Sequence, residues 1–374
     1  MIVERFLSLD LISLLVIACL FKFCSSTWNF SAVNLTNDVP IWRFAFWRNR
    51  AFFAVPSFSR RGQLVNSELT LLESCWPEPG SNHSGFAATL ADNDVRIFPK
   101  SALAFDKCHK LSSVVALDIE SRGRLWVLDA PEDHDCSAKI LVYDLRRNDL
   151  EIARTDLGGV RKENLKSLVI DPVYGLWGPR AYVGDPGDES IIVYSLFKRR
   201  WWRLKLTSDH RIPSFSPTEM AISRKSAFLY LTDSRSQDLF SVDLETLRDE
   251  EGPSIFHERE IERNSSIQWV GRKMGKSSGL AIDQRGGLHY FLVTEHASVR
   301  WDMKHDLKAN GYSILLQSAE VPCITDYRLD SQRNVWALVN LENPLVKTSN
   351  TIYQGKWHAH FRTARIFKHN SFAP

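Results

Sequence analysis

Five polar residues occupy equivalent places in the chain, each at the point where a short apolar segment ends. They are Asp129, Asp185, Asp233, Glu295 and Asn340, and they recur at intervals of 45 to 62 residues. Four carboxylates and one amide at one edge of a β structure would attract an amine or a cation, because their oxygens accept hydrogen bonds. The alternative is that each caps a turn by accepting hydrogen bonds from nearby backbone amides. Spacing alone leaves both interpretations open.

A second group of polar residues begins the apolar segments instead of ending them. A central calcium ion would need about six to eight oxygen ligands. Glu219, Asp326 and Asn164 offer three side chains of the right kind, but they form no ordered ligand set, so we expect no metal. The full group is Lys166, Thr218, Glu219, Ser277, Ser278, Thr325 and Asp326.

The eleven histidines fall into no metal-binding pattern, and no Gly-X-Ser-X-Gly nucleophile motif is present. His296 follows Glu295 and is the better acid–base candidate, because imidazole titrates near neutral pH. His289 is expected in a strand, packed or on a sheet face. His109 and His134 are expected in solvated loops. The catalytic residues, if there are any, are therefore not indicated by a motif.

These residues need a scaffold that repeats, and the chain contains one. Its clearest copy holds three segments rich in Val, Leu, Trp and Tyr, which suit strands: Ser113–Ile119, Arg124–Asp129 and Ile140–Leu145. Gly123 supplies the turn between the first two, because glycine adopts positive φ without steric cost. A similar meander returns four more times before residue 345, and residues 42–107 supply another.

A meander recurring about every 40–50 residues is typical of a propeller blade. The sequence therefore predicts an all-β fold, a six-bladed β-propeller, formed by residues 42–374 as one domain. We expect Trp42–Phe46 or Ala51–Val55 to pair with strands of the last blade, since that pairing would close the ring and remove its exposed edges.

The first 41 residues are expected to lie outside the propeller. Residues 1–26 are predicted to be a signal peptide, with the apolar run Leu11–Phe21 and small residues at Cys24–Ser26; a short membrane anchor is the alternative. Residues 27–41 are predicted to be a polar, mobile lead-in. The protein is expected to be secreted and extracellular.

Cysteines and glycosylation sequons agree with secretion. Cys108 and Cys136 bracket one meander and are predicted to form a disulfide, the default in an oxidising compartment. The partners of Cys75 and Cys323 cannot be read locally. Four Asn-X-Ser/Thr sequons are predicted to be glycosylated, at Asn29, Asn34, Asn82 and Asn264.

Charge argues against nucleic acid as a partner. The chain has 47 basic and 44 acidic residues, a formal net charge of +3, too balanced for a nucleic-acid footprint. The basic run Lys198–Arg200 beside Trp201 is interpreted as a solvated turn. Glycine-rich phosphate loops are missing, so no cofactor is expected.

Several separated segments, in order, resemble the yellow / major royal jelly protein family of arthropods. The resemblance covers roughly residues 40–345. Arg122 and Arg300 lie where many relatives carry cysteines, so the family's disulfide pairings are not carried over. The matching blocks are Cys108–Leu111 with Gly123–Asp129, Ala181–Asp185 with Ile192–Ser195, Ala227–Thr232, Leu239–Arg248, Gln268–Ser278 and Val335–Asn340.

The resemblance implies several functions on one scaffold, and the fold alone does not choose among them. The leading hypothesis is a monomeric protein that binds a small aromatic amine at the propeller mouth or acts extracellularly in cuticle or pigmentation, with no nucleic-acid or membrane partner. Asn340 matches an asparagine near the amine site of salivary relatives, and Glu295, Asp233 and Tyr327 are placed beside it, with Phe46 and Trp301 as further aromatic walls. The alternatives are a dopachrome-converting enzyme of melanin synthesis and a storage protein.

Overall fold

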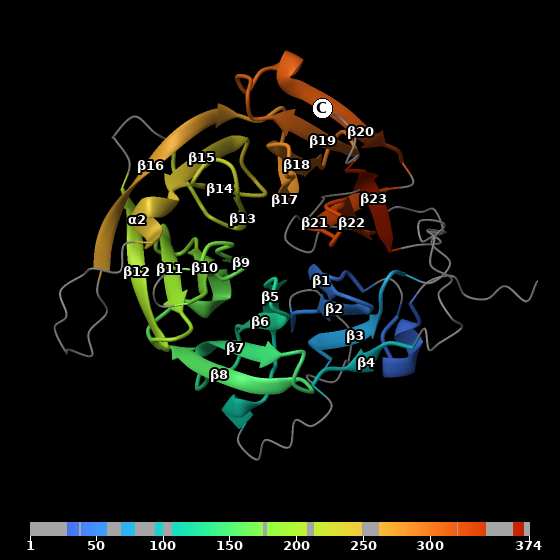
Figure 1. Cartoon of the computed structure of the whole chain (residues 1–374), viewed down its shortest axis with the longest axis vertical. Coiled ribbons are helices and arrows are strands. Elements are labelled where there is room, and N and C mark those ends of the chain that lie inside the picture. The colour runs from blue at the N-terminus through green and yellow to red at the C-terminus, as the bar shows by residue number, and fades with distance from the viewer. Residues whose placement is uncertain are drawn as a thin grey trace, which may run out of the picture.

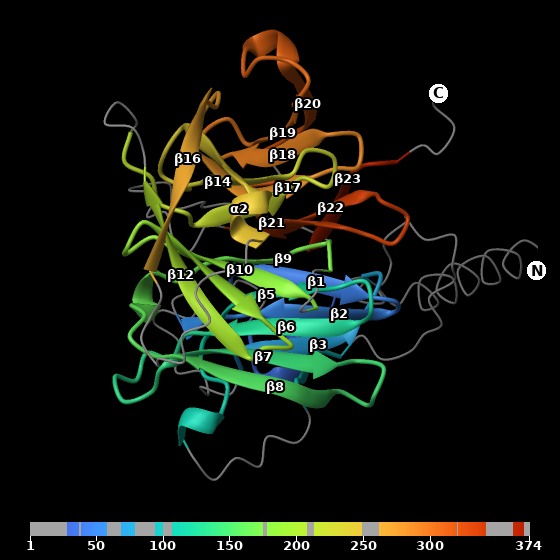
Figure 2. The same cartoon turned by 60° about the vertical axis from the view of Figure 1, so that its left-hand side comes forward.

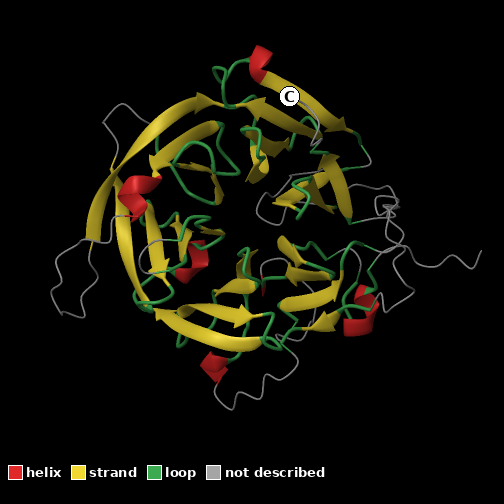
Figure 3. Ribbon diagram, viewed as in Figure 1, coloured by secondary structure: helices red, strands yellow, loops and turns green. Residues whose placement is uncertain are grey.

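The protein is built almost entirely from β-strands (Figure 3). The computed structural model describes residues 28–36, 39–57, 69–78, 94–99, 107–174, 178–207, 213–248, 262–319, 321–341 and 362–369. The predicted signal peptide and the sequon at Asn82 lie outside these residues. No helix in these ranges is long and apolar enough to cross a membrane.

The strands follow one another as antiparallel meanders. The predicted strands at Ser113–Ile119, Arg124–Asp129 and Ile140–Leu145 are confirmed as β5, β6 and β7, within two residues at each end. The strands are β1 (Arg43–Trp47), β2 (Arg50–Ala54), β3 (Leu71–Cys75), β4 (Arg96–Ile97), β5 (Val114–Ile119), β6 (Arg124–Asp129), β7 (Ala138–Asp144), β8 (Leu150–Leu157), β9 (Leu168–Ile170), β10 (Arg180–Asp185), β11 (Ser190–Ser195), β12 (Arg200–Thr207), β13 (Glu219–Ile222), β14 (Phe228–Thr232), β15 (Asp238–Asp243), β16 (Glu262–Arg272), β17 (Ser277–Ile282), β18 (Gly287–Leu292), β19 (Ala297–Asp302), β20 (Tyr312–Gln317), β21 (Cys323–Leu329), β22 (Val335–Asn340) and β23 (Thr363–Phe367). The helices are short: η1 (Phe30–Val33), η3 (Lys107–His109), η4 (Lys162–Asn164), α2 (Leu244–Arg248) and η5 (Ala309–Gly311).

The sheets stand around a central axis, with the first strand of each meander nearest the axis (Figure 1). Strands β1–β4, β5–β8 and β17–β20 form four-stranded sheets, and β21–β23 form a three-stranded sheet. Strands β9–β16 form one eight-stranded sheet, because β12 pairs in parallel with β16 and so joins two meanders edge to edge (Figure 2). The arrangement is that of a β-propeller-like fold.

The hydrophobic core lies between neighbouring sheets. Side chains of a strand point alternately to its two faces, and here both faces are covered, so every residue of β6 is buried. Trp126 and Leu128 of β6 pack with Val183 and Ile192 of the following meander. The ring is therefore held together by apolar contacts from sheet to sheet.

The expectation of a mobile lead-in differs from what the structure shows for its described part. Trp28, Phe30 and Leu35 are buried in the same cluster as Phe53 of β2. The indole N–H of Trp28 donates to the carbonyl of Cys75 at 2.8 Å. These residues therefore belong to the folded domain, because their apolar side chains pack in a cluster formed by the first and last sheets.

The predicted closure of the ring by strand pairing is wrong in the described residues. β1 pairs with β2 in the order β1–β2–β3–β4, and the last sheet is β21–β22–β23. Side chains join the two sheets instead. Asn340 Oδ1 accepts from the backbone N–H of Ile41 at 2.9 Å, while its Nδ2 donates to the carbonyl of Ile41 at 2.8 Å and to Thr325 Oγ1 at 2.6 Å.

A buried carboxylate makes a second polar contact between these sheets. Glu78, just after β3, accepts from the backbone N–H groups of Arg362 at 2.8 Å and Thr363 at 2.7 Å. Burial raises the pKa of Glu78 to about 7, although these hydrogen bonds act in the opposite direction. The first and last sheets are thus joined by hydrogen bonds that water does not reach.

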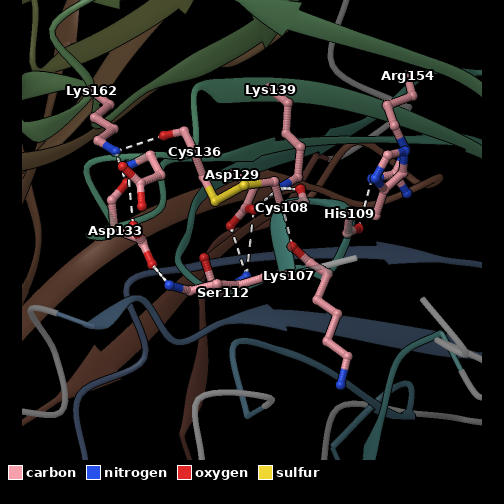
Figure 4. Close-up of a disulfide and its surroundings, with 12 residues drawn as sticks. Lys107, Cys108, His109, Ser112, Asp129, Asp133, Cys136, Lys139, Arg154 and Lys162 are labelled. Atoms are coloured by element: carbon pink, nitrogen blue, oxygen red, sulfur yellow. Dashed lines mark hydrogen bonds and ion pairs between the residues drawn. A yellow bond between two sulfur atoms is a disulfide. The ribbon is translucent and has the colours of Figure 1, made fainter. Parts of the chain in front are cut away.

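The predicted disulfide between Cys108 and Cys136 is confirmed (Figure 4). Lys139 Nζ lies beside it, where it pairs with Asp129 at 2.9 Å and donates to the carbonyl of Cys108 at 2.7 Å. Asp129 Oδ1 also accepts from the backbone N–H of Ser113 at 2.7 Å. Asp129 therefore has the capping role that was the alternative to ligand binding.

Replacing Asn340 by Ala should lower the free energy of unfolding by about 2–4 kcal/mol, because the backbone groups of Ile41 would stay buried without partners. Urea unfolding followed by tryptophan fluorescence measures the change. Asn310→Ala, at an exposed position in η5, is the matched control and should change stability by less than about 0.5 kcal/mol. Equal stability of the two variants would contradict the closing role of Asn340.

Candidate functional site

The starts of the inner strands converge at one end of the ring, and Arg43 connects them. Its Nη1 donates to the carbonyl of Thr325 at 2.6 Å, and its Nη2 donates to Glu219 Oε2 at 2.8 Å. Nη2 also lies 3.4 Å from the carbonyls of Lys166 and Thr218. One guanidinium from β1 therefore reaches the starts of β9, β13 and β21.

Two buried carboxylates lie around this guanidinium. Glu219 pairs with Arg43, and Asp326 lies 3.9 Å from Arg43 and 3.3 Å from Arg328. Burial raises the pKa of both carboxyl groups, and the nearby arginines oppose the rise. Oε1 of Glu219 is buried and has no hydrogen-bond partner among the described residues. That oxygen can accept a hydrogen bond from an N–H group of a ligand.

A buried lysine lies near the same end. Lys273, between β16 and β17, is 3% exposed, and its Nζ donates to Thr232 Oγ1 at 2.5 Å and Ser277 Oγ at 2.7 Å. Burial lowers its pKa to about 7, while the charges of Glu219 and Asp233 oppose the fall. This amine can exchange a proton near neutral pH, as a general acid–base group requires.

Two of the predicted ligand-binding residues lie near the short segment that contains Lys273 and Gly275. Asp233 follows β14 and pairs with Arg235 at 3.3 Å, and its charge acts on Lys273. Glu295 is exposed in the turn between β18 and β19. A side-chain carbon added at Gly275 would lie 3.3 Å from the Glu295 carboxylate. The structure therefore brings Asp233 and Glu295 near one short segment, Asp233 near Lys273 and Glu295 near Gly275.

Asn340 and Tyr327 are fully buried, and their polar atoms are used within the protein. Asn340 closes the ring, and the hydroxyl of Tyr327 lies 2.8 Å from Ser298 Oγ. Their roles toward a ligand stay predictions. Trp301 is buried in the core between sheets, and Phe46 stacks on Trp76 with ring centroids 4.0 Å apart, so both aromatic side chains have structural positions.

The histidine positions agree in part with the sequence interpretation. His289 is buried in β18 with Nε2 2.9 Å from Asp283, so the prediction of a packed histidine is confirmed. His296 is exposed, and its Nδ1 lies 3.0 Å from the carbonyl of Pro322. In the described ranges no group of three or more His, Cys, Asp or Glu side chains could hold a metal ion.

Residues 112–356 match the family model described as major royal jelly protein. The chain belongs to this family. It is 24% identical over 311 residues to Major royal jelly protein 9 of Apis mellifera, covering 76% of this chain and 67% of that protein. It is 33% identical over 107 residues to Dopaminechrome tautomerase of Drosophila melanogaster, covering 26% of this chain and 23% of that one.

Solved structures resemble the fold more distantly. Virginiamycin B lyase from Staphylococcus aureus is 10% identical, with a TM-score of 0.49 and coverage of 81% of this chain and 79% of that one. A streptogramin B lyase gives a TM-score of 0.41 at 9% identity, with coverage of 60% and 61%. We draw nothing about function from these two structures.

Sequence reasoning missed Arg43 and Lys273. Arg43 is a lone charge in an aromatic strand, Trp42–Trp47, and a charge in a strand with both faces buried signals an internal partner. Lys273 belongs to a segment that matched the family, but nothing local shows that it is buried. Both residues stand in the sequence, but only the tertiary structure shows that they lie where the inner strands converge.

The pKa of Lys273 predicts a pH dependence of stability. Between about pH 7 and the ordinary lysine value of 10.5, the unfolded chain binds a proton at this position that the folded protein does not. The free energy of unfolding should therefore rise with pH in that window. The rise should be larger in the wild type than in Lys273→Met, as measured by urea unfolding at pH 7, 8.5 and 10.

Lys276→Met is the matched control, because Lys276 is exposed three residues away. Its pH slope should equal that of the wild type. A Lys273→Met protein with an unchanged slope would show that Lys273 titrates at its ordinary pKa.

Proposed function

We propose that the chain is a secreted six-bladed β-propeller of the major royal jelly protein family that binds a small aromatic amine where its inner strands begin. In this count the eight-stranded sheet is two blades joined through β12 and β16, and β21–β23 belong to the last blade. Secretion rests on the predicted signal peptide and on the family.

The buried oxygen of Glu219 carries the proposal. A buried acceptor without a donor costs about 1–3 kcal/mol, more when it is charged. Arg43 satisfies only the other carboxylate oxygen, Oε2. An ammonium group placed at Oε1 would remove this cost and add a charge-assisted hydrogen bond. The observation thus favours a ligand that carries a cationic N–H group.

The residues of this site would contact the ligand in different ways in this proposal. Glu219 takes the direct ammonium contact, in place of Asn340, because the amide of Asn340 is engaged with Ile41. Asp233 and Glu295 add negative charge near the site without a direct bond. Tyr327 stays a predicted aromatic neighbour.

Calorimetry with serotonin and dopamine tests the proposal. Glu219→Gln should weaken binding by about tenfold to a hundredfold, since it removes a hydrogen bond to a charged group worth roughly 1.5–3 kcal/mol. Glu295→Gln is the control at an exposed carboxylate and should weaken binding no more than about threefold. A thermal melt confirms that each variant is folded.

Unchanged amine affinity in folded Glu219→Gln would remove Glu219 from the site. No heat of binding with the unmodified protein would remove the amine hypothesis altogether and leave the enzymatic and storage alternatives.

Lys273 favours a second candidate function, conversion of an aminochrome. A tautomerase moves a proton between carbon and oxygen without net oxidation, and Lys273 has a pKa near 7 beside Ser277. The partial similarity to Dopaminechrome tautomerase supports the same substrate class.

Loss of dopaminechrome absorbance, compared with a buffer blank, measures this activity. Lys273→Met should reduce the rate at least about a hundredfold if Lys273 transfers the proton, whereas Lys276→Met should leave it unchanged. A wild-type rate equal to the blank would exclude the activity, and together with the absence of amine binding it would favour storage.

A further inference from the structure

The end of the ring opposite the candidate site differs in its exposed charges. This end is formed by the turns after the first and third strands of each meander. These turns share one end because alternate strands of a meander run in opposite directions. Some neighbouring turns approach one another closely. The guanidinium of Arg122, in the turn between β5 and β6, stacks on Tyr174 of the loop between β9 and β10, 4.4 Å from the ring centroid. A side-chain carbon added at Gly286 would lie 3.9 Å from Lys225 of the preceding meander.

Two acidic residues of these turns, Glu120 and Asp283, are buried and paired inside the protein, whereas Glu245 and Asp306 are exposed. Glu120 pairs with Arg124 at 2.8 Å and accepts from Tyr174 at 3.0 Å. Asp283 is bonded by His289 at 2.9 Å and by Arg300 at 2.6 Å. Their negative charge is therefore largely compensated within the fold and is buried.

Most basic residues of the same turns are exposed. The turn Glu120-Ser121-Arg122-Gly123 shows the pattern, because its first residue is buried and its third is exposed. Arg199 also donates to the carbonyl of Ile152 at 3.2 Å, which connects its turn to β8 of the preceding sheet. We use the name basic face for the exposed residues Arg48, Arg122, Arg146, Arg147, Arg199, Arg200, Arg224, Lys225 and Arg333.

The opposite end shows no such excess. Its exposed loops carry Glu132, Asp135 and Glu295 together with Arg235 and Lys276, so both signs are present. The formal net charge of +3 therefore hides an uneven distribution. A field of one sign spread over several turns attracts an extended polyanion more strongly than it attracts a small ion.

We propose that the basic face binds an anionic polysaccharide, in particular a sulfated one. Eight of its nine members are arginines, and the planar guanidinium fork matches sulfate and carboxylate oxygens. The charges follow successive turns around the ring, which suits a linear chain that crosses several sheets.

Two other macromolecules fit the face less well. Binding of single-stranded nucleic acid depends on aromatic faces for base stacking, but Trp47 and Tyr174 are already covered by Arg48 and Arg122. Membrane binding depends on an apolar patch among the charges. The large apolar side chains exposed at this end, Leu150, Val173 and Phe197, belong to two neighbouring meanders, whereas the basic residues continue around the ring.

Heparin serves as the sulfated probe. In a titration at 0.1 M salt, the triple variant Arg122→Ser, Arg147→Ser, Arg224→Ser should bind heparin at least about tenfold more weakly than the wild type, and it should elute from a heparin column at lower salt. The control is Arg161→Ser, Arg272→Ser, Lys276→Ser, which removes the same charge from exposed residues of the other end. It should stay within about twofold of the wild type.

Equal losses in the two triple variants would overturn the proposal, because they would show a response to net charge alone. Absence of heparin binding by the wild type would also overturn it. Tighter binding to phosphatidylserine vesicles or to single-stranded DNA than to heparin would assign the face to another partner. A thermal melt of each variant separates loss of binding from loss of folding.

Discussion

The end of the ring where the inner strands begin depends on the hydrogen bonds of the Arg43 guanidinium. This guanidinium binds a carboxylate and backbone carbonyls at the starts of three other inner strands. A charge buried this deeply is tolerated only when it is paired and its hydrogen bonds are satisfied. Among the described residues, the same arrangement leaves one oxygen of Glu219 without a donor, so Arg43 both connects the inner strands and borders the candidate site.

Closure of the ring also depends on buried polar groups whose hydrogen bonds are satisfied. The apolar contacts between sheets have no direction, so they do not by themselves fix how the first sheet meets the last. The hydrogen bonds of Asn340 with Ile41 and of Glu78 with Arg362 and Thr363 are directional and buried. They fix the relative position of the two sheets, between which the described residues form no strand pairing.

The two ends of the ring differ because successive turns of a meander alternate between them. Turns at one end bring carboxylates and Lys273 close to the axis, and turns at the other end expose more arginines than acidic residues, with Glu120 and Asp283 buried. One repeated unit can therefore present the proposed amine-binding end and the proposed polyanion-binding end. The propeller-like scaffold requires neither, since only apolar alternation and turn geometry are needed to form the strands.

The sequence by itself determined the all-β fold, the strands of the first complete meander and the Cys108–Cys136 bridge, because strand periodicity and the reach of a disulfide are local properties. It also placed Asp233 and Glu295 at one end, since both follow the second strand of a meander. Only the tertiary structure decided that Asn340 closes the ring, that residues 28–35 pack into the core, and that Arg43 and Lys273 belong near the site. Those roles depend on contacts between residues far apart in the chain. Whether a polar group is buried depends on its surroundings in the fold, which a local sequence pattern does not show.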